Sequence, residues 1–265
     1  MDVAGYTASI FIGIALGVIG GGGSILTVPA LVYLFSVDAV LATAYSLFIV
    51  GTTSVVGSIS YFQKGLVNIK TAIVFGIPSI FAVFLTRVFI LPAIPNELFN
   101  VGDFVVTKSI LLMLIFAVLM IFASISMIKK TDELVDEIPQ KQQFNYPLII
   151  LEGSVVGILT GLVGAGGGFL IIPALVLLSK LPMKEAIGTS LVIIAAKSLI
   201  GFIGESGETA IDWLFLLKVT SFAIAGIFIG MGLSKRINGE KLKPTFGWFV
   251  MIMGIYIIVK ETMLK

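Results

Sequence analysis

The sequence predicts an all-α membrane protein, a polytopic helical bundle of two inverted repeats, and three observations carry this prediction. The 265 residues are 58% hydrophobic and only 12% charged, with a mean hydropathy of +1.13, which excludes a soluble globule. The apolar runs are continuous and about 20 residues long, the length of one bilayer crossing, whereas a membrane β-barrel would show short alternating segments. The third observation is a glycine cluster that occurs twice.

The two glycine clusters, at 17–29 and 161–173, share one pattern and stand 144 residues apart. Between 14–57 and 158–201, 17 of 44 aligned positions are identical, whereas composition alone predicts about one in ten. The chain is therefore an internal duplication, whose common core is a glycine-interrupted segment and the helix that follows it.

Taken in order, the predicted elements are eight apolar segments. They span residues 6–35, 41–62, 69–91, 105–128, 147–179, 185–203, 213–233 and 245–259. The first and fifth are too long for one ordinary span and contain the glycine clusters, so we predict that each is a broken, re-entrant hairpin. Each repeat then holds one hairpin and three transmembrane helices: 1–128 is the first repeat, 129–146 a hydrophilic linker and 147–265 the second repeat.

The distribution of Lys and Arg favours the hairpin topology. If both long segments crossed the bilayer, seven basic residues would face each side, and the positive-inside bias would vanish. If both return to the side they entered, eleven gather on one side against three or four. This model places the linker in the cytoplasm and the N-terminus outside, and it gives each repeat three crossings, so that the two repeats are inverted.

Each glycine cluster predicts an anion site. A helix that ends and restarts inside the membrane directs unpaired backbone N–H groups and a helix dipole into the interior, which suits a negatively charged ligand. The alternative is a purely structural role, in which the glycines only let neighbouring helices pack closely. The predicted donors are Gly20, Gly21, Gly22, Gly23, Ser24, Gly164, Gly166, Gly167 and Gly168.

Side chains on the helices after the clusters add to this predicted substrate site. Ser46, Thr189 and Ser190 offer hydroxyl donors, although hydroxyls in membranes also bond their own helix. Lys197 lies deep in its segment, where a lysine is costly and usually turned toward a partner or pathway. Its side chain could instead snorkel to the nearby segment end. Arg87 is placed near the outer face.

The residue inventory excludes several functions. The chain has no Cys and no His, so it lacks thiol chemistry, the commonest metal ligand and the commonest general base. We predict no catalytic residues, no metal, no cofactor and no enzymatic activity. A net charge of +2 with scattered basic residues gives no reason to expect nucleic acid binding.

The paired motifs resemble the TauE/SafE sulfite exporter family of membrane permeases. The resemblance rests on Gly17-x-x-Gly20-Gly-Gly-Gly23-Ser24 with Pro29-Ala-Leu, and on Gly161-x-x-Gly164-Ala-Gly-Gly-Gly168 with Pro173-Ala-Leu. The stretches 42–47 and 186–191 are also similar. The resemblance implies a permease for small anions, chiefly sulfite or organosulfur anions such as sulfoacetate.

Our leading hypothesis is a secondary transporter that moves a small anion, in the direction of export, by alternating access around the two breaks. A passive anion channel and a non-transporting membrane scaffold remain alternatives. The expected partners are the anionic substrate and the lipid bilayer of the inner cell membrane, and a homodimer is left open.

Overall fold

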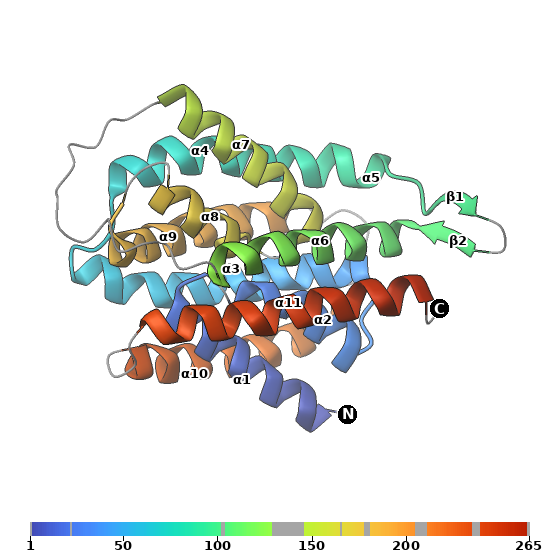
Figure 1. Ribbon diagram of the computed structural model, residues 1–265, viewed down its shortest axis with the longest axis horizontal. Coiled ribbons are helices and arrows are strands. Elements are labelled where there is room, and N and C mark those ends of the chain that lie inside the picture. The colour runs from blue at the N-terminus through green and yellow to red at the C-terminus, as the bar shows by residue number, and fades with distance from the viewer. Residues whose placement is uncertain are drawn as a thin grey trace.

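The computed structural model describes residues 2–21, 23–101, 104–128, 146–164, 166–177, 181–204, 211–234 and 239–263. In this part of the chain the fold is an all-α bundle whose helices run roughly along the long axis of the molecule (Figure 1). The predicted linker at 129–146 lies outside the described residues except for its last position, where a helix begins.

In the first half of the chain, the described residues form six α-helices, a π-helical turn and a β-hairpin. They are α1 (Asp2–Ile19), α2 (Ser24–Leu34), α3 (Ala39–Gln63), α4 (Ile69–Leu85), the π-helical turn η1 (Thr86–Ile90), α5 (Leu91–Ala93), β1 (Glu97–Val101), β2 (Phe104–Thr107) and α6 (Lys108–Ile128). The sequence did not predict the antiparallel hairpin, and residues 105–107, counted in an apolar segment, form its second strand.

In the second half, the part of the chain that the structure describes forms five helices, in the order expected from the duplication. They are α7 (Tyr146–Val163), α8 (Gly168–Leu177), α9 (Met183–Ile203), α10 (Trp213–Ser234) and α11 (Gly239–Met263). Helix α11 is longer than the predicted segment at 245–259. Both long apolar segments are interrupted at their glycine clusters, as the sequence predicted.

Six helices of the described residues are long and apolar enough to cross a membrane: α3, α4 with its extension to Ala93, α6, α7, α9 and α10. Their outer faces are apolar as well. On α4, Ile69, Ile73, Ile77 and Phe81 recur every four residues and are all exposed, so they form one stripe along the helix. An apolar stripe on the outside of a bundle is suited to lipid and not to water.

Local side chains determine where two of these helices begin. Asp38 precedes α3, and its carboxylate accepts a hydrogen bond from the Val40 amide at 2.8 Å. Asn68 precedes α4 and accepts from the Thr71 amide at 3.0 Å. Both are N-caps, which satisfy amides that have no partner within the helix.

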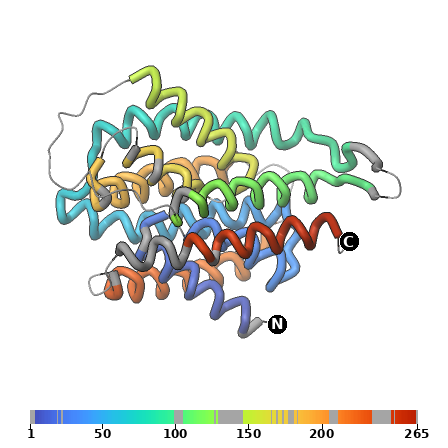
Figure 2. Tube along the Cα trace, in the orientation of Figure 1, coloured from blue at the N-terminus to red at the C-terminus, as the bar shows by residue number. Residues whose placement is uncertain are grey.

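Each long helix of the first half packs against a helix of the second half, and we call these contacts exchanged pairs. Helix α1 packs on α10, and its counterpart α7 packs on the counterpart α4; α3 packs on α9, and α6 on α11 (Figure 2). Figure 1 shows both termini and the β1–β2 hairpin at one end of the bundle, and the turn between α3 and α4 at the other. The two halves are therefore intertwined, so that the interior lies between them.

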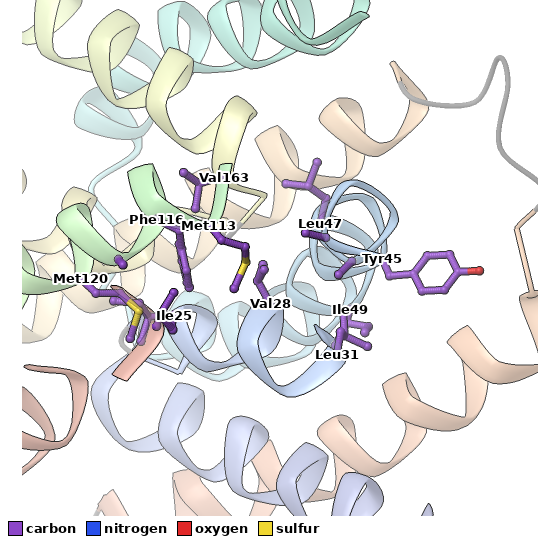
Figure 3. Packing of buried hydrophobic residues seen from close by; sticks show 14 of the residues in the cluster. Ile25, Val28, Leu31, Tyr45, Leu47, Ile49, Met113, Phe116, Met120 and Val163 are labelled. Carbon is purple, nitrogen blue, oxygen red and sulfur yellow. The ribbon is translucent and has the colours of Figure 1, made fainter. Parts of the chain in front are cut away.

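The broken segment of the first half is embedded in the core. Ile25, Val28 and Leu31 of α2 are at most 1% exposed. They pack among Tyr45, Leu47 and Ile49 of α3, Met113, Phe116 and Met120 of α6, and Val163 at the end of α7 (Figure 3). Because α2 is covered on several sides, the first break is held at a defined place inside the bundle.

Candidate functional site

The first helix of each interrupted segment ends on a glycine in the left-handed conformation. Gly20 has φ +82° and its amide donates to the Leu16 carbonyl at 2.8 Å; Gly164 has φ +72° and its amide donates to the Thr160 carbonyl at 2.8 Å. Many α-helices end with one residue in this left-handed conformation. The residue is usually glycine, because a side chain is strained at positive φ.

After each break the chain folds back beside the helix it has just left. A Cβ added at Gly23 would lie 2.5 Å from the Ile12 carbonyl oxygen, and one added at Gly167 would overlap the Thr160 side chain. Residues seven or more apart in one continuous helix could not touch in this way. The new helices α2 and α8 therefore begin in the interior, where their first amides have no partner within the helix.

The two breaks are in direct contact. A Cβ added at Gly21 would lie 2.7 Å from the Cα of Gly168, and one added at Gly168 would lie 2.5 Å from the Cα of Gly21. Only backbone fits between the breaks, so glycine is required at both positions. The structure thus brings together two predicted site segments that are 147 residues apart in sequence.

Lys197 lies beside the second break. Its side chain is 1% exposed, and its ammonium donates to the Thr160 hydroxyl at 3.1 Å. A Cβ added at Gly167 would lie 2.7 Å from Nζ, so the ammonium is directly over that glycine. Among the described residues this hydroxyl is its one hydrogen-bond partner. The side chain therefore does not snorkel to the end of α9, and its amino group lies in the interior.

Ser198 follows Lys197 on α9 and also faces the second break. Its hydroxyl is buried, has no hydrogen-bond partner among the described residues, and lies 3.3 Å from where a Cβ would stand on Gly166. The sequence analysis did not include this serine in the predicted site. An unsatisfied buried hydroxyl at a helix break is suited to a bound ligand.

Three of the four hydroxyls that the sequence predicted for the site are already hydrogen-bonded in the described chain. The Ser24 hydroxyl donates to the Gly21 carbonyl at 2.7 Å, and the Ser190 hydroxyl donates to Ile187 of its own helix. The Thr189 hydroxyl accepts from the Asn68 amide at 2.9 Å, which joins α9 to the start of α4. Ser46 is buried without a partner among the described residues. Gly22 lies outside them.

Arg87 is a second buried cation. The sequence analysis placed it near the outer face and gave it no role in the site, and its side chain is 1% exposed. Its Nη1 donates to the Thr43 hydroxyl at 3.0 Å, and Thr43 contacts Gly164 of the second break. A charge inside an apolar run was the signal that singled out Lys197, and it applied here too.

Arg87 lies in the π-helical turn η1. Such turns widen the helix by one residue and are frequent at functional sites. The second break thus combines the backbone amides at the start of α8 with three nearby side chains. These are the ammonium of Lys197, the guanidinium of Arg87 and the hydroxyl of Ser198. This arrangement can stabilise a small anion, and it offers no nucleophile–base pair and, in the described residues, no cluster of metal ligands.

Long apolar helices, two contacting helix breaks and buried cations beside one break together define a polytopic membrane protein of the transporter class. The chain belongs to the TauE/SafE sulfite exporter family, whose model matches residues 6–257. This confirms the resemblance predicted from the paired motifs.

Relatives are similar over nearly their full length. A probable membrane transporter protein of Xylella fastidiosa is 29% identical, over 93% of this chain and 91% of the relative. The probable membrane transporter protein YunE of Bacillus subtilis is 29% identical, over 96% and 95%. A similar protein of Methanocaldococcus jannaschii is 25% identical, over 94% of both chains. No solved structure matches the chain.

These names agree with a multi-pass membrane transporter of the TauE/SafE type and point to a role other than catalysis.

Proposed function

We propose that this protein is a secondary transporter that exports small oxyanions, sulfite or an organosulfur anion such as sulfoacetate, by alternating access. In this proposal the anion binds near the midplane of the membrane, at the place where the two glycine breaks meet. The binding energy comes from the charge of Lys197 and from backbone amides at the breaks, those of Gly20, Gly21, Gly23, Ser24, Gly164, Gly166, Gly167 and Gly168. The family's printed description as a sulfite exporter supports this substrate class.

The observation that carries the proposal is the position of Lys197. Its ammonium is buried against Gly167 with one neutral hydroxyl as its hydrogen-bond partner among the described residues. An ammonium has three donors, and removing it from water costs several kcal/mol unless a counter-charge or further acceptors are present. A bound oxyanion would supply both. The buried ammonium is therefore stabilised when an oxyanion occupies the site.

The exchanged helix pairs support two halves that are inverted relative to each other. In such transporters one half rocks against the other around a fixed central site. We place the N-terminus and the β1–β2 hairpin outside, and the segment 129–146 in the cytoplasm of a cell with this protein in its inner membrane. The concentration of Lys and Arg on the linker side supports this orientation.

The test is anion flux into proteoliposomes that contain Lys197→Gln. We expect sulfite flux to fall by about tenfold or more, because a charge-assisted hydrogen bond is worth about 1.5–3 kcal/mol and tenfold corresponds to 1.4. Lys218→Gln is the matched control, since Lys218 is exposed on α10, and it should transport like wild type. Undiminished flux in Lys197→Gln, with correct insertion, would remove Lys197 from the site.

The same assay separates the alternatives. A carrier saturates and shows accelerated exchange against unlabelled anion on the opposite side, whereas a channel shows unitary currents and no counter-transport. A scaffold shows neither. A thermal-shift screen of sulfite, sulfate, sulfoacetate, acetate and phosphate would identify the ligand, because a ligand that binds only the folded state raises its stability.

A further inference from the structure

The duplication lets each contact of one glycine break be compared with its counterpart at the other. Adding 144 to a residue number converts the first repeat into the second. A Cβ added at Gly20 would overlap Ile187, and a Cβ added at Gly164 would overlap Thr43; Ile187 and Thr43 are themselves counterparts. The two breaks thus have equivalent neighbours, and any chemical difference between those neighbours is a difference between two equivalent places.

The equivalence extends along the preceding helices. Gly17 contacts the backbone of α10 at Ile227 and Met231, and its counterpart Gly161 contacts Val83 of α4 and Thr86 of η1. By the same offset, Met231 is the counterpart of Arg87. The position that carries a guanidinium in η1, which continues α4, therefore carries an uncharged thioether in the counterpart helix α10.

Further pairs show the same contrast. Gly23 contacts Leu16, whereas its counterpart Gly167 contacts Thr160, which is the counterpart of Leu16. Lys197 corresponds to Thr53, whose hydroxyl donates to the carbonyl oxygens of Ile49 and Val50 in its own helix at 2.7 and 3.1 Å. Among the described contacts of the first break's glycines there is no charged side chain.

The first break is not devoid of polar atoms, but these are uncharged hydroxyls. The Ser24 hydroxyl is bonded to the Gly21 carbonyl, and the Thr27 hydroxyl is buried. Ser54 and Ser198 are counterparts, and both hydroxyls are buried without a partner in the described chain, so this pair does not distinguish the breaks. The distinguishing residues are the two cations and the threonines that bind them.

We infer that the anion site is one-sided: Thr43, Arg87, Thr160 and Lys197 build it around the second break, and the first break is its apolar counterpart, which supports the site without holding the anion. This inference rests on the proposed function and narrows it from two equivalent breaks to one. Ser198, whose free hydroxyl faces Gly166, is a further donor to the same anion.

The physical reason is the cost of charge in a low-dielectric interior. Burying a charged group costs free energy, so Lys197, whose one hydrogen-bond partner among the described residues is a neutral hydroxyl, is expected where an anion binds. If both breaks held the anion equally, their neighbours should carry similar charge. Arg87 also provides a planar fork of donors that matches two oxygens of an oxyanion.

The test exchanges each distinguishing cation for the residue at its counterpart, in the full-length protein. Arg87→Met and Lys197→Thr should each weaken sulfite binding and lower proteoliposome flux by about tenfold or more. Met231→Leu and Thr53→Val change the equivalent positions of the first break and should leave both within about twofold. Binding is measured on purified protein with sulfite, and folding by monodispersity and thermal unfolding. Should Arg87→Met fail to fold, Arg87→Lys is used instead, because it keeps the positive charge but loses the planar guanidinium. Arg87→Lys should weaken sulfite binding less than Lys197→Thr does.

The outcomes separate the two proposals. If wild type binds and transports sulfite but first-break and second-break variants are impaired equally, the one-sided site is wrong and the transporter stands. If Arg87→Met and Lys197→Thr bind sulfite as wild type does, Arg87 and Lys197 are not in the site. If wild type moves none of the anions sulfite, sulfate and sulfoacetate, the proposed function fails and this inference with it.

Discussion

The ammonium of Lys197 on α9 lies 3.1 Å from the hydroxyl of Thr160 on α7. Thr160 stands in the last turn before the second break, and its carbonyl accepts from the amide of Gly164. One residue therefore holds both the end of α7 and the buried cation. This links the geometry of the break to the position of the charge.

Thr160→Val should remove the hydrogen bond of Lys197 without changing the volume of the side chain by much. An unsatisfied buried charged donor costs about 1–3 kcal/mol, so we expect a lower unfolding temperature and weaker sulfite binding. Thr220→Val is the control, because the buried Thr220 hydroxyl donates to the Leu216 carbonyl of its own helix and, among the described residues, has no other hydrogen-bond partner. Equal effects of the two substitutions on sulfite binding would argue against a role for the Lys197–Thr160 pair.

Gly20→Ala should destabilise the first break for two reasons. The residue has φ +82°, and a Cβ would overlap the Ile187 side chain. Gly65→Ala separates the effect of positive φ from the effect of steric overlap. Gly65 has φ +67° and nothing within 4 Å of an added Cβ, so the substitution incurs only the backbone cost of about 1–2 kcal/mol. Chemical or thermal unfolding in detergent should rank Gly20→Ala as clearly the worse of the two, and a smaller loss than for Gly65→Ala would contradict the tight packing of this break.

Gly168→Ala should separate the two breaks, since its Cβ would lie 2.5 Å from the Cα of Gly21 and 2.6 Å from the Ile194 side chain. If contact between the breaks forms the transport site, sulfite flux should fall severalfold more than the stability of the protein explains. Gly232→Ala is the matched control, because an added Cβ there has nothing within 4 Å. Flux equal to that of the control would show that the contact is not needed for transport.

The orientation can be tested directly because the chain has no cysteine. Single cysteines at Glu97, in the hairpin β1–β2, and at Lys64, at the turn between α3 and α4, lie at opposite ends of the bundle (Figure 1). With the N-terminus outside, an impermeant maleimide should label Glu97→Cys in intact cells and Lys64→Cys only after permeabilisation. The reverse pattern would invert the proposed orientation.

The amino-acid sequence was sufficient to predict the membrane class, the family and the places where the two long segments break. These are local properties. Apolar length determines which segments suit a bilayer, and clustered glycines such as Gly20 and Gly164 end helices because they adopt positive φ without strain. The strand Phe104–Thr107 was missed because Val, Phe and Thr favour a strand as readily as a membrane helix.

The candidate site was predicted only in part, because it depends on which residues meet across the bundle. Lys197 stood out as a charge far from a segment end, but nothing local distinguishes an Arg87 that snorkels outward from one that turns inward to Thr43. Thr189 was predicted as a binding hydroxyl, and only the fold shows that its oxygen also accepts from the Asn68 amide.

By itself, then, the sequence determined that this chain lies in a membrane, that it is an internal duplication and at which residues its helices are interrupted. Only the tertiary structure decided that Gly21 meets Gly168 and that both Arg87 and Lys197 are buried close to the second break. The reason is that helix ends follow from short-range backbone sterics, whereas the neighbours of a charge follow from packing between segments far apart in the chain.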